Sequence, residues 1–202
     1  MKTNKQKIML LTAYAILAAL VIVLQSFVSI PLGPYYVTLT LVPIMVGAIL
    51  YGPACGAFLG AVFGVVVSIQ VVTGAAGYYS FEMFRHLPAV TIAICMVKGT
   101  MAGLVSGLVY QPFRKKSGGL QLLGTVLAAV SCPIVNTGIF AVGLMAFYGK
   151  LVSVWTVENG YATAVAFLFI FMIGVNFLVE FAINVLLIPA VMRIIGAVKK
   201  NA

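Results

Sequence analysis

The chain has 202 residues, of which 63% are hydrophobic and only 7% are charged, and its formal net charge is +9. Soluble domains carry about 25% charged residues, so this composition excludes a soluble globular protein. The basic residues flank apolar runs, which is typical of topology-setting charge and argues against nucleic-acid binding. They form three clusters: Lys2, Lys5 and Lys7; Arg114, Lys115 and Lys116; and Arg193, Lys199 and Lys200.

Apolar runs long enough to cross a bilayer recur along the whole sequence, which predicts an all-α, polytopic membrane protein. A transmembrane barrel would show short alternating segments instead. We expect a single membrane domain over residues 1–202 with six transmembrane helices. Their predicted positions are residues 8–28, 38–51, 53–73, 88–110, 120–147 and 163–196.

The first predicted span follows a lysine-rich start and therefore has some features of a signal peptide. Its apolar run is too long for the hydrophobic region of a signal peptide, and no A-x-A cleavage site follows, so we interpret it as a retained helix. Ala15 and Ala19 lie one helical turn apart on this span. Such a small-residue face permits close approach of another helix.

The second predicted span is short and follows "IPLGPYYVTLT", whose prolines and alternating threonines favour extended chain. The third and fourth spans each carry glycines at every fourth position, in "GPACGAFLGAVFG" and "KGTMAGLVSG". Such stripes let two helix backbones approach closely. Packing within the chain is the favoured interpretation of the two stripes. The last span is longer than one crossing needs, which predicts a tilt, a protrusion or a bend near Pro189.

The loop charges predict that both termini are cytoplasmic, because this orientation places most basic residues inside. The predicted external loops are then residues 29–37, 74–88 and 148–161. They carry Glu82, Arg85, His86, Glu158, the single tryptophan and several tyrosines. Two interpretations are open: an aromatic belt at the membrane interface, or a lid that covers a ligand.

Three spans carry a polar residue at a similar depth below the external face. Lys98 lies ten residues after Pro88, or about 15 Å below the surface at helical rise. Asn136 lies at about 16 Å by the same measure, and Asn176 is at a comparable depth. Pro133 and Gly138 interrupt the helix around Asn136 and Thr137, which predicts a pocket open to the outside; an interhelical hydrogen bond is the alternative.

Asn176, Glu180 and Asn184 share one helix face in "NFLVEFAIN". We favour a structural role for Glu180 and Asn184; Glu180 lies where it could neutralise Lys98 or tie helices together. The sequence shows no nucleophile–base pair, no metal-binding cluster and no phosphate-binding loop, so we expect no enzyme, no cofactor and no metal. The three cysteines, Cys55, Cys95 and Cys132, are predicted to be small buried packing residues.

Over nearly its whole length, the sequence resembles the substrate-binding S components of energy-coupling factor (ECF) vitamin transporters. The similarity is to the subgroup that includes riboflavin, folate, pantothenate and cobalamin binders. It rests on "VTLTLVPIMVGAILYGPACGAFLGAVFG", "KGTMAGLVSGLVY" and "CPIVNTGIF".

The resemblance implies a bacterial cytoplasmic-membrane protein that binds a vitamin from outside and hydrolyses no ATP. A separate transmembrane T subunit and two cytoplasmic ATPases would supply the energy, and the S component would topple in the bilayer to release its ligand. It further implies docking on the T subunit through Ala15 and Ala19. The pocket positions that follow from it are Tyr35, Tyr36, Arg85, Lys98, Asn136, Thr137 and Asn176.

The basic residues Lys98 and Arg85 favour an anionic ligand, since a carboxylate gains a charge-assisted hydrogen bond in a low-dielectric pocket. The few aromatic residues favour a small carboxylate such as pantothenate over a flavin or corrinoid. Folate and riboflavin remain open alternatives. A self-sufficient secondary transporter is a further alternative, although no inverted repeat is visible, and an intramembrane enzyme lacks a catalytic constellation.

Overall fold

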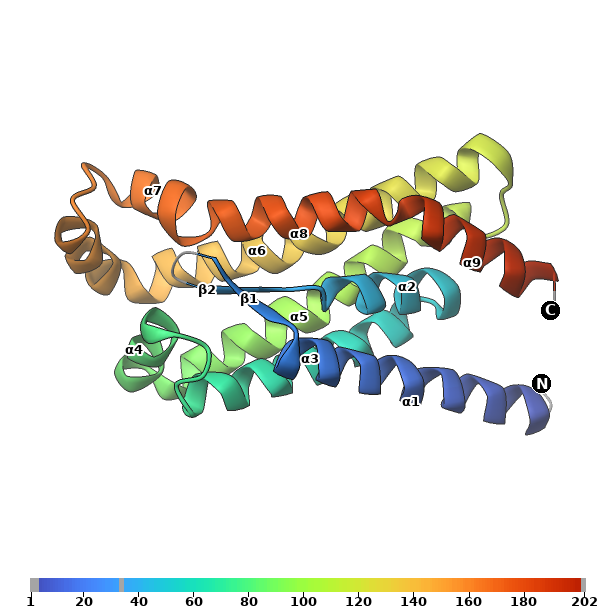
Figure 1. Cartoon of the computed structure of the whole chain (residues 1–202), viewed down its shortest axis with the longest axis horizontal. Coiled ribbons are helices and arrows are strands. Elements are labelled where there is room, and N and C mark those ends of the chain that lie inside the picture. The colour runs from blue at the N-terminus through green and yellow to red at the C-terminus, as the bar shows by residue number, and fades with distance from the viewer. Residues whose placement is uncertain (1–3, 33–34, 201–202) are drawn as a thin grey trace.

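The protein is an all-α bundle with one short β-hairpin (Figure 1). The computed structural model describes residues 4–32 and 35–200. The elements are α1 (Asn4–Phe27), β1 (Ser29–Leu32), β2 (Tyr35–Thr38), α2 (Leu41–Tyr51), α3 (Pro53–Val72), α4 (Tyr78–His86), α5 (Pro88–Tyr110), the 3-10 turn η1 (Gln111–Phe113), α6 (Gly118–Glu158), α7 (Ala164–Ala166), the π-helical segment η2 (Phe167–Met172), α8 (Gly174–Leu186) and α9 (Ile188–Lys200).

Several helices are long and apolar enough to cross a bilayer. In the described part of the chain these are Lys7–Phe27, Pro53–Val72, Pro88–Phe113 and Gly118–Glu158, and the pair Ala164–Met172 and Gly174–Leu186, bent by 43°, is a fifth if it counts as one span. The bundle is multi-pass and integral to the membrane, as predicted. Helix α2 has 11 residues, fewer than the roughly 20 that a crossing needs, so a sixth crossing at residues 38–51 stays a prediction.

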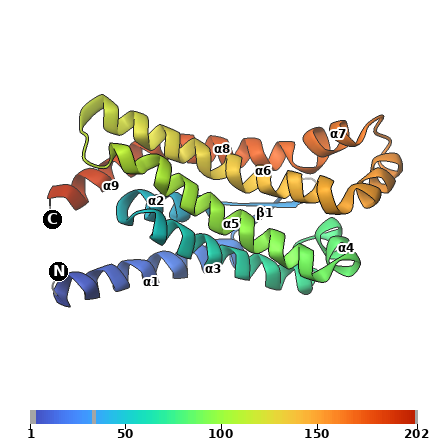
Figure 2. The ribbon, with the colours of Figure 1, turned by 180° about the vertical axis from the view of Figure 1, so that it is seen from behind.

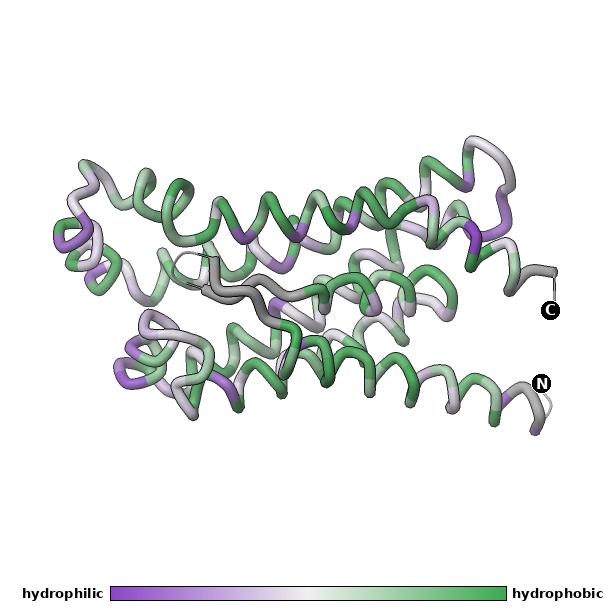
Figure 3. Tube along the Cα trace, in the orientation of Figure 1, coloured by the Kyte–Doolittle hydropathy of each residue, from purple (hydrophilic) through white to green (hydrophobic). Residues whose placement is uncertain are grey.

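Hydrophilic residues gather at the two ends of the bundle, and apolar residues dominate its length (Figure 3). Large apolar side chains such as Ile16, Val65, Ile69 and Leu178 are exposed on the outside of the helices. In a soluble protein this much apolar surface would be a liability, whereas lipid tails cover it at no cost. Both described chain ends lie at the same end of the bundle, opposite α4 (Figure 1).

The stretch between α1 and α2 is extended, as its prolines and threonines predict. Strands β1 and β2 pair in antiparallel register, with Ser29 opposite Thr38 and Leu32 opposite Tyr35. The backbone leaves this hairpin directly into α2, so the hairpin fixes how the end of α1 and the start of α2 approach each other.

The two glycine stripes pack against each other, so the interpretation as packing within the chain is confirmed. Helices α3 and α5 lie side by side (Figure 2). A Cβ atom added to Gly56 would collide with the backbone oxygen of Gly103, and one added to Gly60 would collide with that of Gly99. A Cβ on Gly64 would lie 2.9 Å from the Cys95 backbone oxygen. Only glycine permits this approach.

The helix of the fifth predicted span does not end at residue 147, and most of the segment 148–161 is helical where a loop was predicted. The end of the membrane crossing itself stays a prediction. Helix α6 continues to Glu158 and bends at Tyr148, where φ is −119° and ψ is 18°. The continuation is stable because Val152 and Trp155, three residues apart, bury their side chains on one face. The segment contains one glycine and no proline to stop the helix.

The segment predicted as the last span, residues 163–196, is broken twice, and one of these breaks is the bend near Pro189 that was among the predicted alternatives. The π-helical segment η2 ends at Ile173, whose φ of −120° and ψ of −21° separate it from α8. A second break at Leu187 separates α8 from α9, two residues before Pro189, which cannot donate the backbone hydrogen bond that a continuous helix requires.

Candidate ligand-binding cavity

A cavity lies between α3, α5, α6 and α8, in the half of the bundle that carries α4. Its volume is about 100 Å³, and it is open in part to the outside. Residues such as Val67, Ile94 and Met172 make a little over half of its wall apolar, and polar side chains make up the rest.

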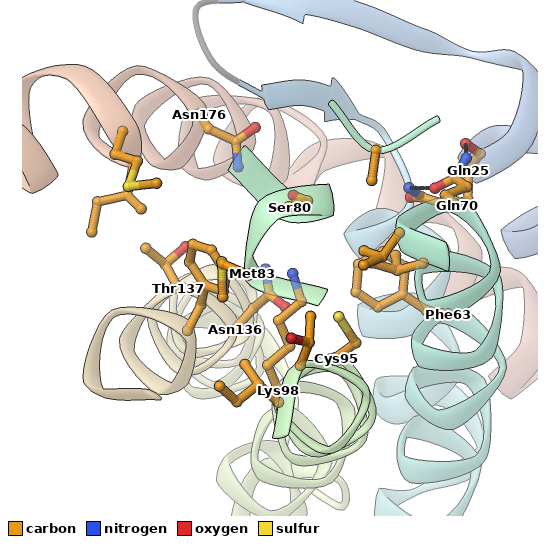
Figure 4. A pocket seen from close by; sticks show the side chains of 18 of the residues that line it. Gln25, Phe63, Gln70, Ser80, Met83, Cys95, Lys98, Asn136, Thr137 and Asn176 are labelled. Carbon is orange, nitrogen blue, oxygen red and sulfur yellow. Dashed lines mark hydrogen bonds between the residues drawn. The ribbon is translucent and has the colours of Figure 1, made fainter. Parts of the chain in front are cut away.

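The polar residues predicted at similar depth reach this cavity from three different helices. Lys98 comes from α5, Asn136 and Thr137 come from α6, and Asn176 comes from α8 (Figure 4). Asn136 is only 5% exposed. The structure therefore brings together four of the seven residues predicted for the site. Pro133 and Asn136 lie inside helix α6, which is not interrupted around Asn136 as predicted.

The other three predicted residues are placed differently. Arg85 lies on α4 outside the cavity lining, where its side chain is 66% exposed and forms a 3.0 Å ion pair with Glu82. This pairing follows from their spacing of three residues on one helix. Tyr35 and Tyr36 contribute their backbones to β2, and their side chains lie outside the part of the chain that the structure describes.

The ammonium group of Lys98 is held between aromatic rings. Its Nζ atom lies 5.0 Å from the ring centroid of Phe140 and 5.8 Å from that of Phe63, and both phenylalanines line the cavity. Among the described residues no carboxylate oxygen lies within 4.0 Å of it. Glu180 lines the same cavity and attracts Lys98 at longer range. The cation therefore has room for an anionic partner.

Among the described residues, three buried oxygen atoms of the cavity have no hydrogen-bond partner. They are Oδ1 of Asn136, Oδ1 of Asn176 and Oε2 of Glu180. Leaving a buried acceptor unsatisfied costs about 1–3 kcal/mol, so such atoms commonly indicate a missing water or ligand. Glu180 is only 6% exposed, and the sequence interpretation omitted it from the site although its spacing from Asn176 was visible.

On the opposite wall, two glutamines that the sequence interpretation missed bond to each other. Gln25 Nε2 donates to Gln70 Oε1 at 2.9 Å, and Gln70 Nε2 donates to the Gln25 backbone oxygen at 2.9 Å (Figure 4). Thr40 Oγ1 donates to Gln25 Oε1 at 3.0 Å. This network joins the end of α1, the start of α2 and α3. Partners 45 residues apart leave no local pattern in the sequence.

Helix α4 covers the cavity with one face and packs against the outer end of the bundle with the other. Ser80 and Met83 line the cavity. The ring of Tyr79 lies 4.9 Å from that of Trp155, centroid to centroid, and its hydroxyl donates to Asn159 Oδ1 at 3.2 Å. The predicted loops were interpreted either as a lid over a ligand or as an aromatic belt at the membrane interface. Part of residues 74–88 covers the cavity, as a lid would, and several aromatic side chains of the predicted loops pack against each other.

The hydroxyl group of Tyr148 ties the bend of α6 to the start of α5. It donates to the Leu87 backbone oxygen at 3.1 Å and lies 2.7 Å from Thr91 Oγ1. Thr91 also lines the cavity. The bend is thus anchored directly beside the cavity wall.

The comparison with protein families decides which family this architecture belongs to. The model of the family described as "ECF transporter, substrate-specific component" matches residues 10–192. The chain belongs to this family. It is therefore the substrate-binding subunit of an ECF transporter and not itself an enzyme, and its family works with T and ATPase subunits.

The solved structures agree with this fold. A structure of ThiT from Listeria monocytogenes is similar with a TM-score of 0.62 and 19% sequence identity, over 94% of this chain and 98% of that one. At this identity the likeness shows the shared fold of the S component and leaves its ligand open. The comparison with curated proteins finds no match.

Proposed function

We propose that this S component captures a small anionic vitamin from outside the cell with high affinity, and that the vitamin is pantothenate. The observation that carries the proposal is the Lys98 ammonium group, which lines the cavity and has no carboxylate within 4.0 Å among the described residues. A carboxylate placed there gains a charge-assisted hydrogen bond at low dielectric. Asn136, Thr137 and Asn176 supply further polar contacts in the same cavity.

Pantothenate fits this inventory because it is small and flexible and carries one carboxylate, one amide and two hydroxyl groups. A permanently cationic vitamin would have to bring its charge close to Lys98, which like-charge repulsion disfavours. Riboflavin and folate carry large flat ring systems and need more stacking surface than the described cavity residues offer.

The orientation follows from charge. Arg114, Lys115 and Lys116 lie in the turn between α5 and α6, at the end of the bundle where both described chain ends lie (Figure 1). Basic loops prefer the cytoplasm. We therefore assign that end to the cytoplasm and the α4 end to the outside, so that the cavity faces the side from which the vitamin arrives.

Docking on the T subunit is assigned to α1. Ala15 and Ala19 are both exposed one turn apart, and small residues on a membrane helix permit close approach by a partner helix. Two ATPase subunits, bound to the T subunit, would then drive release of the vitamin inside.

Titration calorimetry of the purified protein against pantothenate, folate, riboflavin and thiamin tests the function. We expect pantothenate to bind with a Kd well below micromolar in the absence of ATP. If no vitamin binds more tightly than about a micromolar Kd, the proposed function is wrong. If another vitamin binds instead, the assignment as a vitamin-binding subunit stands and the choice of pantothenate does not. Gradient-driven uptake into liposomes by this chain alone would point to a secondary transporter.

A further inference from the structure

The hydrogen-bonding capacity of the cavity is unevenly distributed. Of the polar residues in its wall, Gln25 and Gln70 satisfy each other, and Thr91 bonds to Leu87 and Tyr148. Apart from the Lys98 ammonium group, the buried polar atoms of the wall that lack a partner among the described residues are the amide oxygens of Asn136 and Asn176 and one carboxylate oxygen of Glu180. Acceptors without partners call for donors, so the ligand must bring O–H or N–H groups to this part of the cavity.

The charges are divided in a complementary way. Lys98 and Glu180 both line the cavity, yet no nitrogen–oxygen distance between them is within 4.0 Å. Each is thus free to contact a different part of one ligand. A carboxylate on the ligand satisfies Lys98, and hydroxyl or amide hydrogens satisfy Glu180. A single ligand that carries both a carboxylate and such donors therefore offsets the cost of burying both charges.

The aromatic rings of the wall are already occupied. Among the described lining residues the aromatic side chains are Phe63 and Phe140, and Lys98 lies over both rings. Trp155 and Tyr79 pack against each other outside the cavity. A flat heterocycle would have to compete with the ammonium group for these faces, which favours an aliphatic ligand.

Resting on the proposed function, we propose that Glu180 is a ligand-binding residue whose carboxylate, with the amide oxygens of Asn136 and Asn176, accepts hydrogen bonds from hydroxyl or N–H groups of the ligand while Lys98 binds its anionic group. The site therefore selects an aliphatic acid that carries donors at the end opposite its carboxylate. This assigns a direction to the bound ligand and gives Glu180 a role in specificity that exceeds helix packing.

Three compounds separate the two ends of the ligand in titration calorimetry on the wild-type protein. Pantothenate carries both ends, pantothenol replaces the carboxylate by an alcohol, and N-(3,3-dimethylbutanoyl)-β-alanine keeps the carboxylate and amide but lacks both hydroxyls. Hydrogen bonds to charged groups contribute about 1.5–3 kcal/mol, so we expect each analogue to bind roughly tenfold or more weakly than pantothenate.

Two variants then assign each loss to its residue. In Lys98→Met, pantothenate and pantothenol should bind within about threefold of each other, because the charge-assisted bond is gone. In Glu180→Gln, the ratio of the Kd of the analogue without hydroxyls to the Kd of pantothenate should fall by about fivefold, because a neutral acceptor forms a weaker hydrogen bond. The matched controls are Lys150→Met and Glu82→Gln, which alter residues outside the cavity lining and should preserve the wild-type pattern.

Each other outcome is decisive. If pantothenate binds tightly but the affinity losses of the two analogues are the same in Lys98→Met and Glu180→Gln as in the wild type, the role of Glu180 is overturned and the proposed function stands. If riboflavin or folate binds tightly and pantothenate and its two analogues do not, both this inference and the choice of pantothenate are overturned. Absence of any binding to monodisperse wild-type protein overturns the proposed function as well. The analogues use the wild-type chain, so a variant that fails to fold does not remove the test.

Discussion

The ammonium nitrogen of Lys98 lies 5.0 Å from the centre of the Phe140 ring, on the neighbouring helix. Lysines in membrane spans usually extend their ammonium groups towards the interface. Here the rings of Phe140 and Phe63 hold the charge inside the bundle, since a cation over an aromatic face gains about 0.5–2 kcal/mol. A ligand site requires a cation retained at this depth beside acceptors that lack partners among the described residues. Helix packing alone does not require one.

Replacing Asn136 by alanine should weaken vitamin binding. Its amide oxygen is buried and has no partner among the described residues, so it can accept a hydrogen bond from the ligand. Loss of one such bond corresponds to about 0.5–1.5 kcal/mol, or a rise in Kd of about two- to tenfold. Calorimetry measures the change, and the yield of monodisperse protein should stay at the wild-type level. An unchanged Kd would remove α6 from the site.

Asn184 offers a matched control because it lies two turns from Asn176 on the same helix. It is fully buried and lies outside the cavity lining, and neither its side-chain oxygen nor its nitrogen has a partner among the described residues. Asn184→Leu removes two unsatisfied polar atoms, each costing about 1–3 kcal/mol, so the melting temperature should rise while the vitamin Kd stays constant. A lower melting temperature would show that Asn184 has a partner, such as a buried water.

The sequence was informative where a regular helix carried the argument. Depth below the membrane surface follows from residue counting along a helix, so Lys98, Asn136 and Asn176 could be expected at one level before any fold was known. The glycine stripes were equally readable, because a small residue at every fourth position indicates close helix packing.

The sequence was uninformative where the outcome depended on partners far along the chain. The bend at Tyr148 depends on bonds to Leu87 and Thr91, and no local pattern marks it. Gln25 and Gln70 look like ordinary polar residues near helix ends until the fold joins them. Glu180 was visible but was assigned to packing, because only the structure shows that its second oxygen lacks a partner.

Gly60→Leu should destabilise the protein strongly. Even the first side-chain atom at this position would collide with the backbone oxygen of Gly99 and lie 3.0 Å from Thr100 Cα, and backbone atoms cannot move aside as a side chain can. Overpacking of this kind costs about 1–3 kcal/mol or more. The measurement is the melting temperature and the fraction of monodisperse protein. Gly138→Leu is the control, because nothing lies within 4 Å of an added Cβ there; equal behaviour of the two variants would contradict the packing of α3 on α5.

Replacing Ala15 or Ala19 by tryptophan should stop transport while leaving vitamin binding unchanged. Both alanines are exposed on α1 and neither lines the cavity, so a bulky side chain there blocks a partner helix without touching the ligand. We expect uptake by the assembled transporter in proteoliposomes to fall by about tenfold or more, since small-residue interfaces depend on close approach. Calorimetry on the isolated subunit should give the wild-type Kd. The control is Leu20→Trp, because Leu20 is also exposed but points to a different side of α1. Normal uptake by the alanine variants, or equal loss in the control, would place the docking surface elsewhere.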